Sequence, residues 1–367
     1  MKIAIVSGTT KSADSVRGIG VHNSSLFKAF SKLRNKDYKI PEVGKNDDLS
    51  EFDVVHFTSF RPFFISLPFF KPKNTKFVLT IHDMHPLIYP KYFAPGLKGG
   101  IRLLINNFLI WKNVDRIITI SETSKKDICR FMGVDPKKVD VVYLAPKPAH
   151  HPLKAGKWVK EIKDKYKLPE KFVFYLGDVN YNKNIPTLVK ACDKAGIKLV
   201  IVGKQAKEIK ENKHGFGVLL GPMDYLRSFF EISHPEIGHY KSLKGDFNNN
   251  EVFCLGFVED NDVNKIMNLA LCTVQPSYYE GFGLSVIHGF ASGSPVISSR
   301  AQALVEVGED ACLYFDPNSV DDLVEKLKIL MTDNKQRNKY IKRGYEQVKK
   351  YSWDKAAYET LEVYRKA

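Results

Sequence analysis

The stretch PSYYEGFGLSVIHGFASGSPVIS, residues 276–298, combines residue types that can hold a phosphorylated ligand. Gly281 and Gly283 precede an apolar run with helical spacing, and glycine lets a backbone approach a ligand without a Cβ in the way. The first amides of a helix offer free N–H groups and the positive end of the helix dipole to an anion. A diphosphate repels Glu280, which is better suited to accept hydrogen bonds from sugar hydroxyls. The pattern predicts a nucleotide-sugar site, although such glycines are also common in turns that bind nothing.

A second loop with suitable chemistry is GDVNYNKN, residues 177–184, which follows an apolar strand pattern. Lys183 then lies near the carboxyl end of a strand, where a cation can neutralise a departing diphosphate. One lysine among 56 Lys and Arg is a weak signal by itself. The predicted site after residue 276 gives it context.

The segment TIHDMHP follows another predicted strand. His82, His85 and the intervening Asp83 have the types needed for acid–base chemistry or for orienting a substrate. They could equally be turn histidines satisfied by backbone groups. We favour a functional role for His82 and a structural one for His85.

Two further segments resemble ligand sites. Gly18 and Gly20 in RGIGVHNSS precede a helical pattern, and this loop is a second place where backbone amides can meet phosphate. It is not a dinucleotide fingerprint, because the third glycine is missing. Asp260 and Asp262 resemble the D-x-D of metal-dependent sugar transferases, but we favour Asp262 or Asn261 as the cap of a helix over VNKIMNLA.

The elements that position these residues alternate between strands and helices in both halves of the chain. Short runs rich in Ile and Val, separated by helical patterns, predict parallel sheets covered on both faces. The alternation restarts after LAPKPAHHPLKAGKW, which reads as a linker. We therefore expect an α/β protein of two doubly wound, Rossmann-like domains facing a central cleft that holds the ligand. Residues 204–250 fit poorly and predict a long excursion with an embedded helix, and residues 352–367 predict a helix capped by Ser352.

Composition excludes several classes. The 367 residues favour two domains, and no stretch reaches the roughly 18 apolar residues of a membrane span. No secretory signal is visible at the first residues. The five cysteines are scattered, which argues against a zinc site or a disulfide framework and for a reduced, cytoplasmic setting.

The net charge of +15 is concentrated in the first half. Residues 1–165 carry 29 Lys and Arg against 15 Asp and Glu. This is either a solvated, lysine-rich surface or a face for an anionic partner. In FRPFFISLPFFKPK, Phe side chains beside Lys71 and Lys73 could dock at lipid headgroups or fill a core under a loop.

Taken in order, these segments resemble glycosyltransferase family 4, the retaining enzymes of GT-B architecture. The resemblance is carried by GIGVHNSSLFKAF, TIHDMHPLIYP, TISETSKKDICRFMG, LGDVNYNKNIPTLVKA and, with most specificity, LGFVEDNDVNKIMNLALCTVQPSYYEGFGLSVIHGFASGSPVISS. The resemblance implies an acceptor-binding domain over residues 1–165 and a nucleotide-sugar domain over residues 166–351. It also implies a C-terminal helix, about 352–367, that returns to the first domain.

The resemblance assigns roles to individual residues. Glu280 would contact the hydroxyls of the sugar, Lys183 would stabilise the diphosphate, and His82 would lie near the transferred sugar; these are the candidate catalytic residues. The nucleotide sugar would be held by Gly18, Gly20, Lys183, Val258, Gly281, Phe282, Gly283, Leu284 and His288. Transfer would proceed with retention of configuration, with no metal and no cofactor besides the nucleotide sugar.

Two positions depart from the family pattern. His288 stands where the family has a second glutamate that accepts both ribose hydroxyls, and an imidazole makes only one such hydrogen bond. Asp178 stands where an arginine often binds the diphosphate. The ribose would therefore be held differently, and Lys183 would carry more of the charge.

Several functions remain in competition. The leading hypothesis is a cytoplasmic hexosyltransferase using GDP-mannose or UDP-glucose, with a glycan or lipid-linked saccharide as acceptor and an anionic membrane surface as a further partner. The mannose preference rests on the style of the HDMHPL segment. The alternative is a nucleotide-sugar-binding relative that has lost catalysis. An NAD-linked oxidoreductase lacks the required glycine fingerprint, and nucleic-acid binding leaves Glu280 without a purpose.

Overall fold

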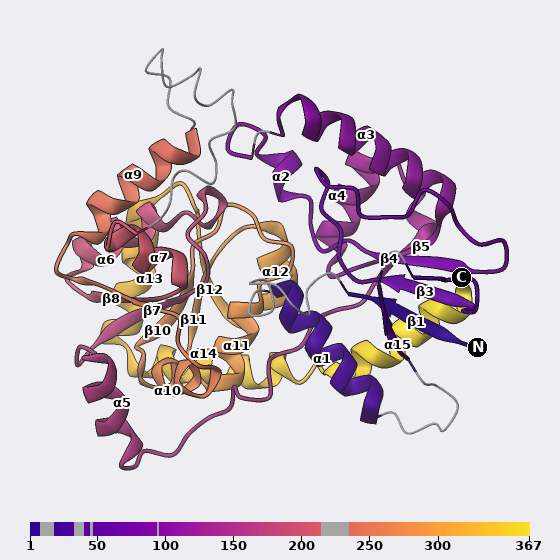
Figure 1. The fold of residues 1–367 in the computed structure, drawn as a ribbon. Helices are drawn as coiled ribbons and strands as arrows, with labels where there is room; N and C mark the ends of the chain where they lie inside the picture. The colour runs from indigo at the N-terminus through magenta and orange to yellow at the C-terminus, as the bar shows by residue number, and fades with distance from the viewer. Residues whose placement is uncertain (8–17, 33–39, 45–46, 94, 214–234) are drawn as a thin grey trace. The chain divides into compact units, whose positions relative to one another are not determined.

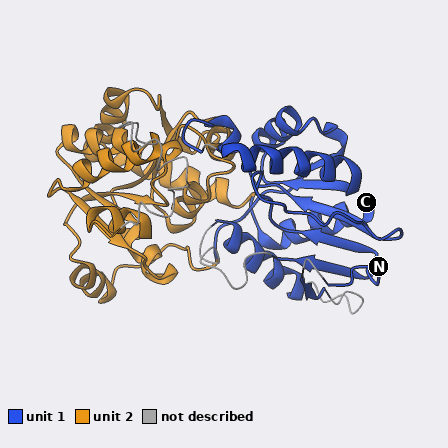
Figure 2. Ribbon diagram, turned by 45° about the horizontal axis from the view of Figure 1, so that its top comes forward, with its two compact units in different colours: residues 1–147, 351–367 blue, residues 148–350 orange. Residues whose placement is uncertain are grey.

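The computed structural model describes residues 1–7, 18–32, 40–44, 47–93, 95–213 and 235–367. The chain divides into two compact units, coloured separately in Figure 2. Unit 1 comprises residues 1–147 and 351–367, and unit 2 comprises residues 148–350.

Within its described residues, unit 1 is built on one parallel sheet (Figure 1). Its strands pair in the order β2-β1-β3-β4-β5-β6. Because the central strands are buried on both faces, their sequences are almost continuously apolar rather than alternating. The strands are β1 (Ile3–Val6), β2 (Glu42–Val43), β3 (Val54–Phe57), β4 (Lys76–Thr80), β5 (Val114–Thr119) and β6 (Val139–Val141).

The helices of unit 1 lie between these strands and at the end of the chain. Ser121 caps α4 (Glu122–Met132) by accepting a hydrogen bond from the amide of Ser124, and Gly133 ends this helix in the left-handed conformation. They are α1 (Gly18–Lys32), α2 (His85–Ile88), α3 (Gly96–Asn113), α4 (Glu122–Met132), the 3-10 turn η2 (Pro136–Lys138) and α15 (Trp353–Lys366).

The C-terminal helix α15 belongs to unit 1, as expected. Ser352 caps it by accepting a hydrogen bond from the amide of Lys355. The Trp353 indole donates to the carbonyl of Pro146 at 3.0 Å, and Tyr364 is buried against His56 of β3. The last 17 residues therefore complete the core of the unit that begins the chain.

Unit 2 repeats the scheme with a second parallel sheet, in the order β12-β11-β10-β7-β8-β9. Chain order reverses between β7 and β10, and this reversal is the switch point where doubly wound sheets bind ligands. The strands are β7 (Phe172–Leu176), β8 (Lys198–Val202), β9 (Val252–Gly256), β10 (Cys272–Gln275), β11 (Val296–Ser299) and β12 (Cys312–Phe315).

The helices of unit 2 enclose this sheet, whose core includes Tyr175, Leu199 and Val274. They are α5 (Trp158–Tyr166), the 3-10 turn η3 (Tyr181–Lys183), α6 (Ile185–Ala195), α7 (Lys204–Lys210), α9 (Pro235–Phe247), α10 (Asp260–Leu269), α11 (Leu284–Ser292), α12 (Gln302–Gly308), α13 (Val320–Thr332) and α14 (Asn334–Val348).

The division between units falls earlier than the expected boundary at residue 165. Residues 148–165 belong to unit 2, because α5 packs against α10 and buries Ile162 beside Val263. The expected excursion over residues 204–250 contains α7 and α9, and residues 214–234 lie outside the described residues. Among the described helices, none combines the length and apolarity that crossing a bilayer requires.

Candidate functional site

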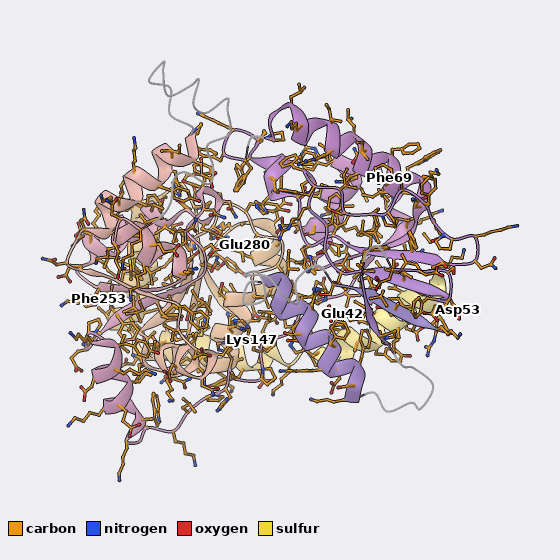
Figure 3. All side chains as sticks on the ribbon, viewed as in Figure 1. Glu42, Asp53, Phe69, Lys147, Phe253 and Glu280 are labelled. Atoms are coloured by element: carbon orange, nitrogen blue, oxygen red, sulfur yellow. The ribbon has the colours of Figure 1, made fainter. Side chains whose placement is uncertain are left out.

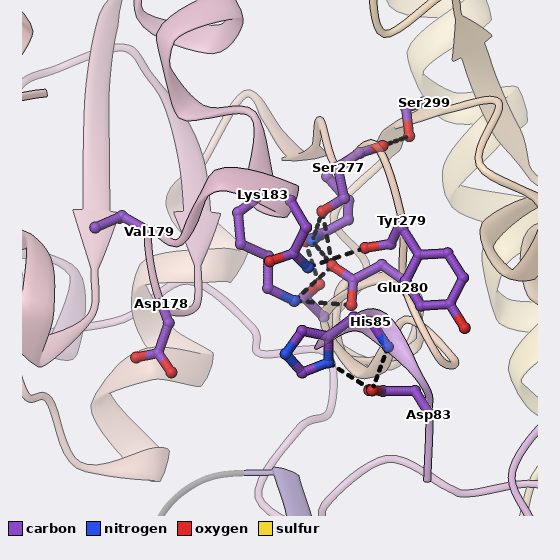
Figure 4. Close-up of polar contacts among 12 residues, drawn as sticks. Asp83, His85, Asp178, Val179, Lys183, Ser277, Tyr279, Glu280 and Ser299 are labelled. Carbon is purple, nitrogen blue, oxygen red and sulfur yellow. Dashed lines mark hydrogen bonds and ion pairs between the residues drawn. The ribbon is translucent and has the colours of Figure 1, made fainter. Parts of the chain in front are cut away.

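Lys183 and Glu280, 97 residues apart in sequence, meet in unit 2 (Figure 4). The Lys183 ammonium donates to both carboxylate oxygens of Glu280, each at 2.8 Å. The two side chains are only 21% and 12% exposed, so the pair is shielded from most of the solvent. Two predicted catalytic residues therefore form one ion pair.

The sheet topology explains this meeting. Lys183 follows β7 and Glu280 follows β10, and these two strands pair in parallel at the switch point. Their carboxyl ends share one edge of the sheet. The loops that leave that edge are then held side by side.

Main-chain and amide bonds lock the two loops together. The amide of Tyr278 donates to the carbonyl of Asn182 at 2.8 Å, and the Asn182 side chain donates to the carbonyl of Tyr279 at 3.2 Å. Asn184, in the left-handed conformation, donates from its side chain to the carbonyl of Pro276 at 3.1 Å. The Asn residues around Lys183 are thus structural supports for its position.

The Glu280 carboxylate is well satisfied even apart from Lys183. Its Oε1 also accepts from Gln275 Nε2 at 2.6 Å and from Ser277 Oγ at 2.7 Å. Burial, reinforced by the nearby carboxylates of Glu280 and Asp178, raises the pKa of the Tyr175 hydroxyl well above its ordinary value. Tyr175 donates to the main-chain carbonyl of Asp178 at 2.6 Å, which fixes the start of the Lys183 loop.

Gly281 to Leu284 form the turn that leads into α11. Gly283 has φ of +111°, in the region that favours glycine, and a Cβ there would lie 2.6 Å from Leu304 Cδ2. The helix begins at Leu284 without a side-chain cap, so its first amides remain available to a ligand. Phe282 is buried and anchors the turn rather than presenting its ring.

His288 lies within α11 and is buried, at 5% exposure. Its ring stacks on that of His150, with centroids 4.0 Å apart and 12° between planes. His150 Nδ1 is 3.1 Å from Ser292 Oγ, one turn further along α11. Sequence reasoning missed His150, because nothing in the linker AHHP marks which histidine turns inward.

His82 belongs to a buried histidine cluster in unit 1. Its Nε2 lies 2.8 Å from His22 Nδ1, and His22 stacks on Trp353 of α15. Within the described residues, Nδ1 of His82 is buried and has no hydrogen-bond partner. Burial lowers the pKa of His82 to about 4, opposed by the nearby Asp83 carboxylate.

The HD segment does not act as one constellation. Asp83 Oδ1 lies 2.5 Å from His85 Nδ1 and accepts from the His85 amide at 3.2 Å (Figure 4). His85 is therefore held by Asp83 at the start of α2, while His82 turns to His22. The structural role favoured for His85 stays a prediction.

Two sequence expectations need correction. Gly18 and Gly20 lie in α1 itself, whose helix begins at Gly18, rather than in a loop before it, because glycine does not by itself stop a helix. The Val258 side chain is buried in the core of unit 2 beside Val263 and Ile266, and its contact with the nucleotide sugar stays a prediction.

The capping role expected for Asp262 or Asn261 is the second error. Helix α10 begins at Asp260, three residues before the expected start at Val263, and Glu259 precedes it without a side-chain cap bond. Asp262 instead accepts from Lys165 at 2.7 Å, from Tyr166 at 3.0 Å and from Lys265 at 3.1 Å. Among the described residues, no three His, Cys, Asp or Glu side chains gather in a way that could hold a metal ion.

Two parallel, doubly wound sheets, with a glycine turn into α11 after β10, match the GT-B architecture of glycosyltransferases. Residues 7–145 match the family described as "Glycosyltransferase Family 4". Residues 239–347 match the family described as "Glycosyl transferases group 1". The chain belongs to the family 4 glycosyltransferases, which confirms the resemblance drawn from the motifs.

Relatives and solved structures are similar over most of the chain. The O-antigen chain mannosyltransferase B of Escherichia coli is 25% identical over 78% of this chain and 70% of its own length. The chain spans 60% and 33% of the length of two further relatives. Sucrose-phosphate synthase from Thermosynechococcus elongatus matches with a TM-score of 0.70 at 16% identity, covering 100% of this chain and 99% of its own. HepE from Anabaena, in complex with UDP and glucose, matches with a TM-score of 0.69 at 14% identity, covering 99% and 98%.

Proposed function

We propose that this glycosyltransferase moves a hexose from a nucleotide-diphosphate sugar to a glycan or lipid-linked saccharide, with retention of configuration. The similarity to a mannosyltransferase favours mannose carried on GDP. The similarity to HepE, which was solved with UDP and glucose, keeps UDP-glucose as the other candidate.

The observation that carries this proposal is the Lys183–Glu280 pair beside the first turn of α11. A diphosphate that docks on the α11 amides competes with Glu280 for the Lys183 ammonium. When Lys183 turns to the diphosphate, Oε2 of Glu280 loses the hydrogen bond from Lys183 and can accept one from a sugar hydroxyl. Gln275 and Ser277 keep the carboxylate in place during this exchange.

Charge stabilisation of the leaving group follows from the same arrangement. As the glycosidic bond to phosphate breaks, negative charge grows on the diphosphate, and Lys183 with the helix N-terminus supplies fixed positive charge at that point. We propose that this replaces a metal ion. The acceptor hydroxyl attacks from the face that the diphosphate leaves, and the departing phosphate oxygen takes its proton.

The test is turnover of a panel of GDP-, UDP-, ADP- and dTDP-sugars in EDTA, following release of both sugar and nucleotide. Slow hydrolysis of one sugar nucleotide is expected, with the anomer of the donor (the α-anomer for GDP-mannose or UDP-glucose) as first product. Turnover that requires an added divalent ion would overturn the metal-independent mechanism. A first product with the anomeric configuration opposite to that of the donor would overturn retention.

A second candidate function is nucleotide-sugar binding without catalysis. It is favoured by His288, because an imidazole stacked on His150 cannot grip two ribose hydroxyls as a carboxylate does. A binder would be protected against thermal unfolding by a nucleotide while leaving every sugar intact, with or without acceptors.

The setting of the reaction is also a proposal. The cysteines are free, and unit 1 carries 27 Lys and Arg against 16 Asp and Glu. Both features fit an enzyme of the cytoplasm that works at the inner face of an anionic membrane, where lipid-linked saccharides are presented.

A further inference from the structure

Helix α3 is apolar on two faces, and only one of them is covered. Leu109 and Ile110 pack into the core of unit 1. On another face, five large apolar side chains recur at spacings of three and four residues and therefore form one stripe along the helix. They are Leu97, Ile101, Leu104, Phe108 and Trp111, exposed by 84, 51, 70, 54 and 77%.

A neighbouring loop extends this stripe with three more aromatic side chains. Phe64, Phe69 and Phe70 are 57, 55 and 87% exposed. Figure 3 shows the side chains that project from the outer side of α3 and labels Phe69. The phenylalanines proposed from sequence as either core or membrane residues thus divide: Phe60 is buried in the core of unit 1, and Phe64, Phe69 and Phe70 are in the solvent.

Two buried asparagines of α3 hold that loop in place. Asn106 donates to the carbonyls of Phe64 at 2.7 Å and Pro62 at 3.0 Å, and it accepts from the amide of Ser66 at 3.2 Å. Asn113 donates to the carbonyl of Pro68 at 3.2 Å. The Arg102 guanidinium lies over the Phe64 ring, 5.8 Å from its centre. Helix and loop therefore present one fixed surface, which we call the apolar ridge: Phe64, Phe69, Phe70, Leu97, Ile101, Leu104, Phe108 and Trp111.

The charges around the ridge identify the occupant that it fits. Residues 54–115 contain eight Lys and Arg against two acidic residues: Asp83, which is engaged by His85, and Asp115, which pairs with Lys71 and Lys76. Lys98, Arg102 and Lys112 lie exposed on α3 itself. Long basic side chains can reach headgroup phosphates while the apolar side chains between them enter the acyl boundary. A protein partner with an apolar face would not require this one-sided charge.

We propose that the apolar ridge docks unit 1 on an anionic lipid bilayer, with α3 lying in the interface plane. Aromatic side chains are the residues best suited to that depth, since their rings sit at the level of the headgroups. Five of the eight ridge residues are aromatic. This extends the lipid-linked acceptor proposed above by naming the surface that brings unit 1 to it.

The experiment is co-sedimentation of the full chain with vesicles of phosphatidylcholine, alone or with 40 mol% phosphatidylglycerol, without any sugar nucleotide. We expect binding to the anionic vesicles only. The paired change Leu104→Ser and Trp111→Ser should weaken partitioning by about 10- to 100-fold, from the apolar area removed. Tyr358→Ser, which removes another exposed aromatic of the same unit (57% exposed), should leave partitioning unchanged.

Two further measurements separate insertion from charge attraction. Trp111→Phe should retain binding yet lose the tryptophan quenching that brominated lipid causes in the wild type. Lys98→Gln and Lys112→Gln should each weaken binding by about fivefold at low salt. Quenching that persists in Trp111→Phe would place another part of the chain in the bilayer and overturn the proposal.

Other outcomes would assign the ridge differently. A wild type that stays in the supernatant with anionic vesicles would refute membrane docking. A dimer in solution that Leu104→Ser dissociates would make the ridge an interface between two copies of this chain. Turnover of soluble sugar nucleotides by the Ser variants, measured in parallel, keeps these failures distinct from failure of the proposed enzymatic activity.

Discussion

Lys183 and Glu280 neutralise one another in the structure, so each must change partner for the proposed reaction to proceed. This exchange of partners costs little free energy, because the Glu280 carboxylate keeps its hydrogen bonds from Gln275 and Ser277. The diphosphate carries two negative charges and therefore attracts the Lys183 ammonium more strongly than the single carboxylate of Glu280 does. The resting ion pair therefore holds both side chains in the site without blocking it.

Lys183→Ala should lower kcat by about 10²–10³, because one preorganised cation at the leaving group is lost. Folding should survive, since Glu280 remains hydrogen-bonded. Initial rates and thermal melting curves measured side by side check both points. The matched control is Lys194→Ala, which removes an exposed lysine paired with Asp321 and should turn over normally. A Lys183→Ala enzyme with an unchanged kcat would remove Lys183 from the mechanism.

His288→Glu should tighten nucleotide binding by about tenfold, since a carboxylate accepts two ribose hydroxyls through charge-assisted bonds. The same change should lower the melting temperature of the free protein, because a buried charge replaces a ring stacked on His150. Calorimetric titration with the nucleotide checks the first effect. His288→Gln, neutral and of the same shape as Glu, is the control. If Gln and Glu bind alike, the ribose does not reach this position.

At the scale of single residues, the sequence predicts Glu280, Lys183 and the Gly283 turn, because each follows a recognisable strand. It cannot predict His22 or His150. Each gains its place from a partner far along the chain, His22 from Trp353 and His150 from His288. The sequence also does not show that the Val258 side chain, although part of a motif, is buried in the core of unit 2.

At the scale of elements, three histidines join α1, β3 and the end of β4 to α15. His56 Nδ1 lies 2.6 Å from the Tyr364 hydroxyl and its Nε2 lies 2.7 Å from Thr80 Oγ1. Burial lowers the pKa of His56 to about 3, and burial with repulsion from His82 and His56 holds the pKa of His22 well below 6.5. All three rings are neutral in the folded protein.

This cluster predicts acid sensitivity between pH 6.5 and about 4. In that window the unfolded chain protonates these histidines while the folded chain does not, so stability is complete above 6.5 and falls as pH falls. With three groups the slope reaches about 4 kcal/mol per pH unit. Urea unfolding at pH 7.5, 6, 5 and 4.5 measures it. A His22→Gln variant should show a smaller slope, and equal slopes would place the sensitivity elsewhere.

Tyr364→Phe isolates one contact between α15 and the sheet. The ring still fills its place, but His56 Nδ1 loses its partner in a buried site, which should cost about 1–3 kcal/mol of unfolding free energy. Denaturant unfolding at pH 7.5 gives the difference. Tyr358→Phe, on the exposed side of the same helix, should change stability by less than about 0.5 kcal/mol.

The positions of most helices and strands were predictable from the sequence. Which face of a helix is buried and which is exposed was not. Periodicity and apolar runs predict the two parallel sheets, α11 and the capped α15. They do not show which side of α3 is covered, because this helix is apolar on both sides and only the surrounding packing distinguishes them. Gly18 similarly begins α1 where the sequence predicts a loop.

At the scale of the whole molecule, the chain builds its first unit from both of its ends. Residues 351–367 supply Trp353, which covers His22, and Tyr364, which fills the core beside His56. Lys183, Glu280, His150 and His288 all lie in unit 2, where Lys183 pairs with Glu280 and His150 contacts His288 and Ser292. Removal of α15 should therefore act on the two units differently.

A chain that ends at Lys350 should lose several kcal/mol of stability in unit 1, since two large buried side chains leave cavities in its core. Its His22–His82 pair loses the Trp353 ring that covers it, so transfer to an acceptor should fall sharply. Nucleotide binding, measured by titration, should remain within about threefold of the full chain because its residues keep their supports. Loss of nucleotide binding together with transfer would mean that the site in unit 2 depends on the C-terminal helix.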